Sequence, residues 1–256
     1  MITKFSVSSL DTHKKCPKKY HYRYIEKPDV KREKWNFTEL GSCAHRIIEL
    51  FHERLLKSHV KRSDFPKLMK QCFVEGVKEF DIRLLQQETW MPSGEMPGTM
   101  ALKIMIQDYL DKLRSMDELP NVIANEMPYS FKLDDRAIVR GFIDRVDQIS
   151  EDTYAVVDYK TSKNPKYLNE FQLLVYAEAL RRKFKNVKKV YGSYVMLKHK
   201  SESKDFEFNE YSMDQCNKKL HKKADLIYSD NTWLKKPSIL CKWCDYRSIC
   251  QDVWAE

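Results

Sequence analysis

The sequence predicts an α/β fold in which a central mixed β-sheet is flanked by helices. Short segments rich in β-branched and aromatic residues cluster in the second half of the chain. Segments with the apolar spacing of amphipathic helices precede and follow them. A further helical segment separates the third strand from the fourth, as in sheets that contain parallel strand pairs.

Length and composition describe a globular chain with excess positive charge. Its 256 residues can bury a substantial core, and we find no internal repeat or low-complexity linker. The net charge of +9 favours a polyanionic partner such as nucleic acid. Neither a long apolar segment nor a secretory signal is found, which excludes membrane-spanning and secreted classes, so we expect a cytoplasmic protein.

The first 119 residues are expected to be mainly helical. Ser8 or Ser9 would begin a short helix that Pro17 interrupts. A longer amphipathic helix would begin at Ser42, which would act as its N-cap. Two further helices, and a loop between them, are expected at 64–88, 98–116 and 91–98.

From about residue 120 the pattern changes to strands. Strands at 122–133 and 137–148 would pair through the turn at 134–136. A third strand at 155–161 follows the polar turn at 150–152. The remaining elements are a helix at about 166–184 that Pro165 would begin, strands at 187–197 and 205–211, and a Lys-rich helix at about 213–228.

The hairpin at 140–161 carries the residues most suggestive of chemistry. If its turn centres on Glu151, residues whose numbers sum to 302 face each other, which places Asp144 opposite Asp158. Lys160 shares a face with Asp158, because side chains alternate along a strand. Such a patch is costly beside apolar residues unless a metal ion binds it. The alternative is a pair of exposed acids with a neighbouring lysine.

These residue types suit the hydrolysis of phosphodiesters. Carboxylates that hold Mg²⁺ or Mn²⁺ can position a nucleophilic water and offset the charge of the transition state. A lysine two residues beyond a ligand, as Lys160 follows Asp158, can polarise that water or balance the developing negative charge.

The segments 141–147 and 157–161 resemble the core of the RecB-like branch of the PD-(D/E)XK nucleases, and the resemblance extends along nearly the whole chain. That branch carries a G-x-x-x-H helix, here Gly41 to His45, and a Q-x-x-x-Y helix, here Gln172 and Tyr176. Ile143 and Asp144 stand where the superfamily's name has Pro and Asp, as is usual in this branch.

The resemblance implies a restriction-endonuclease-like core with a bound Mg²⁺ or Mn²⁺. The implied metal ligands are His45, Asp144, Asp158 and the Tyr159 carbonyl oxygen. The implied catalytic residues are Lys160, Asp144, Asp158, Gln172 and Tyr176. Lys160 would act on the water, and the helix face of Gln172 and Tyr176 would lie beside the acids and the DNA strand.

Some of these residues have simpler explanations when taken singly. His45 could be a packed or capping residue, and Gln172 and Tyr176 an ordinary helix surface. Glu126, in the neighbouring strand, could reach the site, which we leave open. The residues expected beside the ligands or on the surface, rather than as ligands, are Asp147, Glu49 and His52.

The cysteines suggest a second metal centre. Cys241, Cys244 and Cys250 form a tight cluster that lacks a fourth ligand, and Cys16 is the best candidate to complete it. Four cysteines can hold Zn²⁺ or a 4Fe–4S cluster, and spacing alone does not choose between them. One distant cysteine with a C-terminal triplet resembles the iron–sulfur subgroup of this branch, which includes AddB-type nuclease domains and the CRISPR-associated adaptation nuclease. A 4Fe–4S cluster is therefore preferred.

The resemblance implies one nuclease domain over residues 1–256. Its parts would be the ends 1–35 and 237–256 joined by the cluster, a helical part at 36–119 and an α/β nuclease core at 120–236. We expect a metal-dependent exonuclease acting on single-stranded DNA ends, with partner proteins in repair, recombination or CRISPR adaptation. The alternative is a nucleic-acid-binding or assembly subunit with little turnover.

Two groups of lysines remain without an assigned role. They are Lys218, Lys219, Lys222 and Lys223 on one predicted helix, and Lys14, Lys15, Lys18 and Lys19 beside Cys16. A lysine stripe is by default a solvated helix face, so no single lysine is assigned to DNA.

Overall fold

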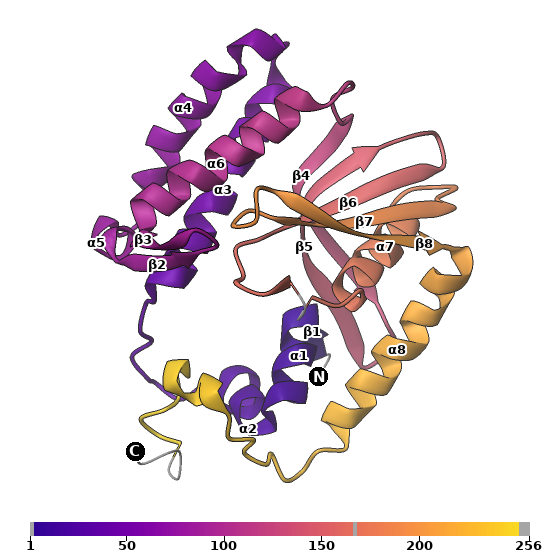
Figure 1. The fold of residues 1–256 in the computed structure, drawn as a ribbon. Helices are drawn as coiled ribbons and strands as arrows, with labels where there is room; N and C mark the ends of the chain where they lie inside the picture. The colour runs from indigo at the N-terminus through magenta and orange to yellow at the C-terminus, as the bar shows by residue number, and fades with distance from the viewer. Residues whose placement is uncertain (1–2, 166–167, 251–256) are drawn as a thin grey trace. The chain divides into compact units, whose positions relative to one another are not determined.

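The computed structural model describes residues 3–165 and 168–250. The chain divides into two compact units (Figure 1). The central unit comprises residues 34–129 and 142–214. The terminal unit comprises residues 1–33, 130–141 and 215–256. Within the described ranges, no helix is both long enough and apolar enough to cross a membrane.

Strands from both halves of the chain form one mixed sheet. Its strands are β1 (Thr3–Phe5), β4 (Val122–Lys132), β5 (Ala137–Gln148), β6 (Thr153–Lys160), β7 (Lys189–Met196) and β8 (Glu202–Asn209). The order is β1-β5-β6-β7-β8, and β4 also pairs with β5. The pairs β1–β5 and β6–β7 are parallel, whereas β5–β6 and β7–β8 are antiparallel. The expected α/β fold with a mixed sheet is confirmed; the three-residue β1 was not foreseen.

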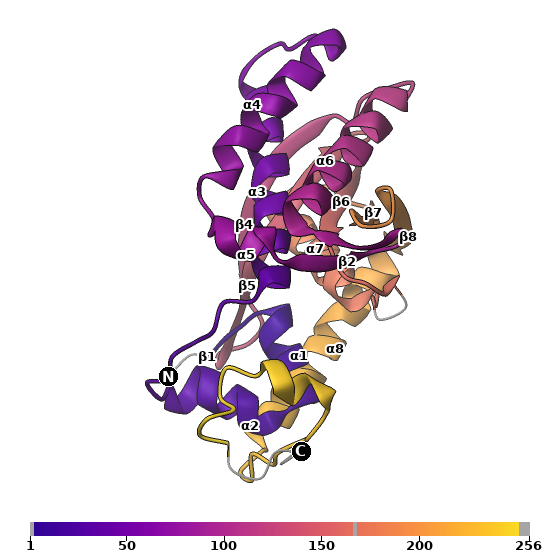
Figure 2. The ribbon, with the colours of Figure 1, turned by 60° about the vertical axis from the view of Figure 1, so that its left-hand side comes forward.

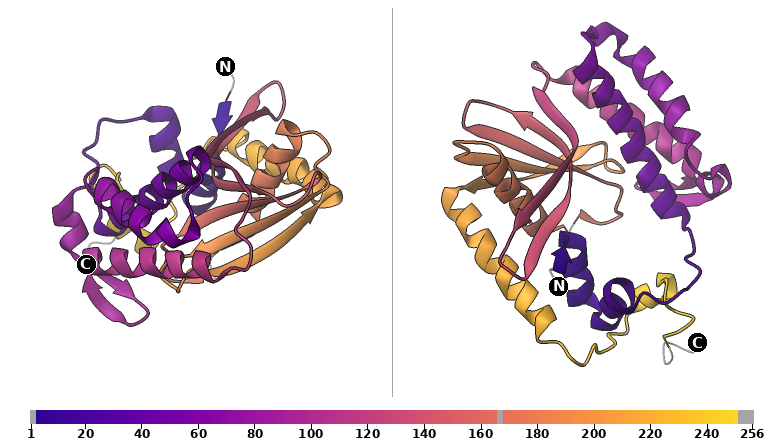
Figure 3. Two further views of the ribbon diagram at one scale, coloured as in Figure 1. Left: turned by 90° about the horizontal axis from the view of Figure 1, so that it is seen from above. Right: turned by 180° about the vertical axis from the view of Figure 1, so that it is seen from behind.

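In the central unit a group of helices covers one face of β6 and β7. It consists of α3 (Asn36–Lys57), the 3₁₀ turn η2 (Arg62–Asp64), α4 (Phe65–Val77), α5 (Ile82–Gln86) and α6 (Gly98–Ser115). The long helices α3, α4 and α6 lie side by side (Figures 1 and 3). Their buried side chains form one apolar cluster with Val157 and Tyr159 of β6 and Val195 of β7.

The helix that carries His45 begins earlier than expected. Its first residue is Asn36, so Ser42 lies inside the helix and does not cap it. Gly41 is needed for close packing instead, because a Cβ there would lie 2.8 Å from Thr161 Oγ1. This contact brings the helix against the chain just beyond β6.

The segment expected as a helix at 64–88 and a loop at 91–98 is more finely divided. It contains α4, the short helix α5 begun by Asp81 and a hairpin of β2 (Glu88–Met91) and β3 (Gly94–Pro97). Each strand has four residues, too few to show a periodic pattern. Gly94 adopts φ 122°, a conformation open to glycine.

Helix α7 (Phe171–Lys183) connects the parallel strands β6 and β7 and covers the opposite face of the sheet. A Cβ on Gly192 of β7 would lie 2.9 Å from Leu173 Cβ, so the helix lies close against this strand. The helix begins at Phe171, five residues later than expected, where the Asn169 side chain accepts a hydrogen bond from Phe171 N. Residues 166 and 167 of the predicted helix lie outside the described ranges.

The terminal unit joins segments from both ends of the chain. It holds α1 (Val7–Lys15), α2 (Pro17–Tyr20), the π-helix η1 (His21–Glu26), most of α8 (Glu210–Tyr228) and the 3₁₀ helix η4 (Ile239–Trp243). Ser6, not Ser8 or Ser9, caps α1, and Pro17 separates α1 from α2 as expected. The C-terminal segment, residues 229–250, runs beside α1 and α2 (Figure 2). Lys18 N donates to Leu234 O at 3.3 Å.

Candidate active site

The pairing of β5 with β6 sets the position of the two aspartates. Arg145 faces Val157 and Gln148 faces Tyr154, which is the register predicted from the turn. The register ends at the pair Arg145–Val157. At Asp144, the residue before Arg145 on β5, the side chain and not the backbone bonds to β6. Asp144 Oδ2 accepts a hydrogen bond from Tyr159 N at 2.9 Å, next to Asp158. The predicted neighbourhood of Asp144 and Asp158 is confirmed.

His45 lies beside the same carboxylate. Its Nδ1 is 3.3 Å from Asp144 Oδ2, and its ring meets the Tyr159 ring edge to face with centroids 5.9 Å apart. The contact between Gly41 and Thr161 explains why the third turn of α3 reaches this strand end. His45 is therefore not simply a packed residue of the helix core.

Glu126 on β4 completes a close group of possible ligands. Donor atoms of His45, Glu126 and Asp144 all lie within 4.8 Å of one another. Glu126 has φ 46°, an uncommon left-handed conformation within strand β4. The neighbouring Asn125 anchors β4 to α3, since its Nδ2 donates to Glu49 O at 2.9 Å. Sequence spacing left Glu126 open because such a local turn of the backbone has no pattern signal.

The carboxylates of this group repel one another. Burial, followed by the charge of Asp158, raises the pKa of Asp144 to about 6. Burial, followed by the charges of Asp144, Glu49 and Asp158, raises the pKa of Glu126 to about 7. A site in which neighbouring carboxylates raise one another's pKa is suited to a divalent cation. Imidazole nitrogen and carboxylate oxygen are accepted donors for Mn²⁺, and carboxylate oxygen for Mg²⁺, so the residues fit such a metal.

Asp158 is held in place by the helix behind it. Its Oδ1 accepts hydrogen bonds from Gln172 Nε2 at 2.7 Å and from Tyr176 OH at 3.2 Å. The same Gln172 Nε2 donates to Tyr176 OH at 2.7 Å. Gln172 and Tyr176 are thus not an ordinary helix surface. They fix one oxygen of a carboxylate that is only 2% exposed.

Lys160 contacts the other oxygen of Asp158. Its Nζ is 2.5 Å from Asp158 Oδ2, an ion pair whose geometry is not that of a hydrogen bond. Lys160 Nζ donates instead to Gln172 Oε1 at 3.3 Å and lies 5.3 Å from the centre of the Tyr194 ring. The lysine is therefore oriented by three neighbours while a quarter of its side chain stays exposed.

A buried polar network lies on the reverse side of β5 and β6. Arg145 Nη1 donates to Tyr109 OH and Tyr159 OH, both at 3.0 Å, and Nη2 donates to Asp147 Oδ2 at 3.0 Å. His52 Nε2 lies 2.5 Å from Tyr109 OH, and burial followed by the charge of Arg145 lowers the pKa of His52 well below its usual value. This network fixes the Tyr159 side chain, so Asp147 and His52 support the site from behind and do not face the ligands.

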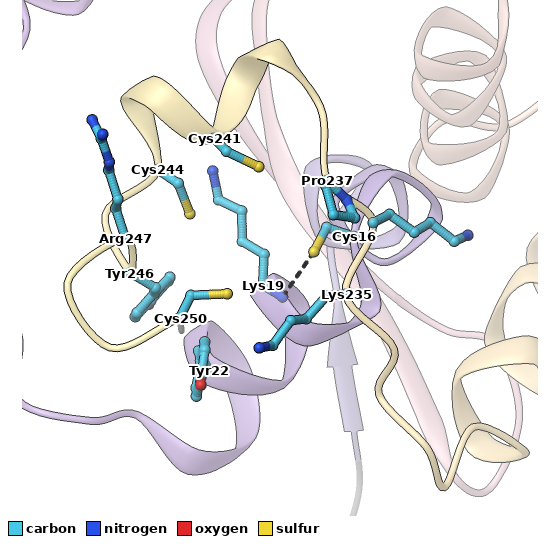
Figure 4. A pocket seen from close by; sticks show the side chains of 11 residues that line it. Cys16, Lys19, Tyr22, Lys235, Pro237, Cys241, Cys244, Tyr246, Arg247 and Cys250 are labelled. Atoms are coloured by element: carbon cyan, nitrogen blue, oxygen red, sulfur yellow. Dashed lines mark hydrogen bonds between the residues drawn. The ribbon is translucent and has the colours of Figure 1, made fainter. Parts of the chain in front are cut away.

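In the terminal unit, the four cysteines expected to cluster do converge. Cys16, Cys241, Cys244 and Cys250 line one pocket, and their sulfur atoms point into it (Figure 4). Backbone N–H groups of Lys19 and Ser238 lie 3.4 Å from the sulfurs of Cys16 and Cys241. The other cysteines, Cys43, Cys72 and Cys216, are buried elsewhere.

The spacing of these sulfurs is wider than a single tetrahedral ion requires. Across residues 3–165 and 168–250, only His45, Glu126 and Asp144 place three donor atoms within 4.8 Å of one another. Zinc bound at about 2.3 Å would hold neighbouring sulfurs about 3.8 Å apart. In a cubane cluster each cysteine binds a different iron, so wider separations are accommodated.

A mixed sheet that carries paired aspartates and a lysine at one strand end, with a histidine of α3 beside them, is the class of site found in metal-dependent nucleases. The chain belongs to the PD-(D/E)XK nuclease superfamily, whose family model matches residues 4–251.

Curated relatives match parts of the chain. A subunit of the ATP-dependent helicase/deoxyribonuclease of Streptococcus mutans is 34% identical over 107 residues, which is 39% of this chain and 10% of that protein. The protein of the same name from Streptococcus pyogenes is 26% identical over 148 residues, 56% of this chain and 13% of that protein. The chain thus matches about a tenth of the length of these relatives.

A solved structure described as a putative exonuclease from Eubacterium rectale is similar over 92% of this chain and 91% of that chain. The sequence identity is 14% and the TM-score is 0.44.

The raised pKa values predict how stability depends on pH when no metal is bound. An acid with a raised pKa binds its proton more tightly in the folded state. Its contribution is greatest below the unfolded pKa and is lost as pH rises toward the folded values of about 7 for Glu126 and about 6 for Asp144. In EDTA, the urea concentration at the midpoint of unfolding should therefore decrease as the pH is raised from 5 to 8. The decrease should be smaller in Glu126→Gln.

The matched control is Glu151→Gln, which changes an exposed acid in the turn between β5 and β6. Its pH profile should follow that of the parent protein. Equal profiles for Glu126→Gln and the parent would show that this carboxylate does not carry the expected charge conflict.

Proposed function

We propose that this chain is a metal-dependent deoxyribonuclease whose reaction takes place at the end of β5 and β6. The observation that supports it best is the convergence of His45, Asp144, Asp158 and Lys160 in the central unit. A protein that only bound nucleic acid would not require this set in a chemically competent arrangement.

The ligands proposed for Mg²⁺ or Mn²⁺ are His45, Asp144, Asp158 and the Tyr159 carbonyl oxygen, with Glu126 added by its proximity. A bound cation would supply positive charge opposite the phosphate and lower the pKa of water. The protein's own part is to hold these carboxylates close together and correctly aimed. Two hydrogen bonds fix Asp158 Oδ1, and the second oxygen of Asp158 forms the ion pair with Lys160.

Lys160 is the proposed catalytic cation. Its ammonium carries three protons that can be donated to an attacking water or to a phosphate oxygen. Gln172 Oε1 accepts one of them, which restricts where the other protons point. Preorganised positive charge of this kind stabilises the negative charge that develops in the transition state. Gln172 and Tyr176 act through Asp158 and Lys160, so these contacts make them positioning residues.

The proposed substrate is DNA, cleaved from single-stranded ends. The net charge of +9 favours a polyanion, and the curated relatives are named as parts of a helicase/deoxyribonuclease. Because those relatives are subunits of larger assemblies by name, partner proteins in DNA repair, recombination or CRISPR adaptation are also proposed. The alternative, an assembly subunit with the nuclease fold and little turnover, is tested by the same assay.

A 4Fe–4S cluster is proposed for the pocket of the four cysteines. Their convergence and the backbone N–H groups near two sulfurs suit a thiolate-bound metal centre, and the wide spacing of the sulfurs favours the cluster over zinc. Such a cluster would join residues 1–35 to 237–256 within a single nuclease domain whose other parts are 36–119 and 120–236. Closing so long a loop removes conformational entropy from the unfolded chain.

Cleavage of DNA should require the active-site side chains. With Mn²⁺ present, Asp158→Ala and Lys160→Ala should each slow degradation of an end-labelled single-stranded oligonucleotide by about 10²-fold or more, because each removes transition-state stabilisation. Comparison of linear and circular single strands shows whether a free end is needed. Glu151→Ala, an exposed acid on the same hairpin, should cleave at the parent rate. Parent-like rates in both active-site variants would refute the proposed enzyme.

The second prediction concerns the cysteines. Anaerobically purified protein should be brown and contain about four iron atoms per chain. Cys250→Ser should lose the colour, most of the iron and several degrees of thermal stability. Cys43→Ala is the matched control, because burial raises the pKa of Cys43 to about 12 and keeps it a protonated thiol away from the pocket. Colourless protein that contains zinc and no iron would contradict the proposed cluster.

A further inference from the structure

A groove in the terminal unit brings together lysines that lie far apart in the sequence. It has a volume of about 610 Å³ and lies between α1 and α8. The lysines that line it are Lys14 from α1, Lys219, Lys222 and Lys223 from α8, and Lys236 from the C-terminal segment. Lys14 thus shares a surface with three of the α8 lysines, although none of these residues belongs to the candidate active site.

The arrangement concentrates positive charge. Burial and then the charge of Lys14 lower the pKa of Lys223, which shows that the ammonium groups of the two helices lie close together. Lys236 Nζ donates to the backbone oxygen of Lys14 at 3.2 Å, so the C-terminal segment is held against α1. Like charges gathered in this way favour binding of an anion with several charges.

The carboxylate of Asp230, which also lines the groove, is held by its own neighbours. Its Oδ2 pairs with His13 Nε2 at 2.9 Å. Its Oδ1 accepts from the backbone N–H groups of Thr232 and Trp233 at 3.0 and 2.9 Å. The oxygens of Asp230 are therefore occupied by neighbours that hold the loop after α8 in place.

Aliphatic side chains line the groove beside the lysines. They are Leu10, Pro17, Leu226 and Leu234, and the lining residues include no aromatic ring of Phe, Tyr or Trp among those that the structure describes. Without such a ring for bases to stack on, lysines among aliphatic side chains suit the repeating phosphates of a backbone and not base recognition.

We propose that this groove binds the phosphate backbone of a nucleic-acid strand, independently of base sequence. It is a second contact surface, made by the terminal unit, and goes beyond the cleavage site of the central unit. The five lysines supply the contacts, and the hydrogen bonds of Asp230 and Lys236 fix the segments that carry them.

The test measures binding without cleavage. Full-length Asp158→Ala protein in EDTA is titrated into a fluorescein-labelled oligothymidylate, and anisotropy is followed as salt is varied. Log K falls as log salt rises, and each lost phosphate contact on a single strand reduces the steepness of this fall by about 0.7. Adding Lys219→Gln and Lys222→Gln should thus reduce the slope by about 1.4, equivalent to about 25-fold weaker binding at 0.1 M salt.

The control adds Lys218→Gln and Lys70→Gln instead, which removes the same charge from two exposed lysines outside the groove. It should leave the slope within experimental error of the parent. Single Lys222→Gln, at a position on the groove wall, should give about half the effect and guards against misfolding of the double variant. Circular dichroism melts confirm that each protein is folded.

Equal slopes for groove and control variants would overturn the proposal, since binding would then reflect diffuse net charge. Loss of binding to a polyglutamate peptide, with DNA binding unchanged, would also overturn it and assign the groove to an acidic protein partner. If the protein with Asp158 intact binds DNA through the groove but does not cleave it with Mn²⁺ present, only the proposed nuclease activity is refuted, so the two failures are distinguishable.

Discussion

The candidate site of the central unit depends on carboxylates that are held close together at one strand end although they repel one another. Asp144, Asp158 and Glu126 are brought so close that burial and neighbouring charge raise the pKa of two of them toward neutrality. Two of these groups are fixed by hydrogen bonds. Asp144 accepts from a backbone N–H, and Asp158 accepts from a glutamine and a tyrosine. Glu126 is placed by the left-handed conformation of its backbone. Such an arrangement costs stability, as functional sites commonly do, and a bound cation would recover it.

The alternation of side chains along β5 separates two kinds of electrostatics. Asp144 faces the candidate site, whereas the adjacent Arg145 faces the helical side and binds Tyr109, Tyr159 and Asp147. The buried guanidinium thereby orders the tyrosine whose backbone N–H holds Asp144 and whose ring meets His45. On the other side, α7 supplies Gln172 and Tyr176 to Asp158. The site is thus supported from both faces of one pair of strands.

Much of the fold follows from local patterns, because turn position sets register in an antiparallel hairpin. The polar turn after β5 correctly predicted the facing residues of β5 and β6, and hence the proximity of Asp144 and Asp158. Patterns failed where tertiary contact decides. Ser42 suggested a helix start but lies inside α3, where Gly41 packs closely against Thr161, and the β2–β3 hairpin is too short to show periodicity. Glu126 depends on an unusual φ, and Lys14 meets the α8 lysines only through folding of the terminal unit.

Asp144 and Glu126, whose pKa values are raised toward neutrality, should release protons when a divalent cation binds between them. Calorimetric titration of the protein with Mn²⁺, repeated in buffers of different ionisation enthalpy, measures the protons released on binding. We expect saturable binding with release of about one proton at pH 6.5 and close to none at pH 8, because metal ligands must be deprotonated. Absence of binding, or binding without proton release at the lower pH, would contradict a metal site at these carboxylates.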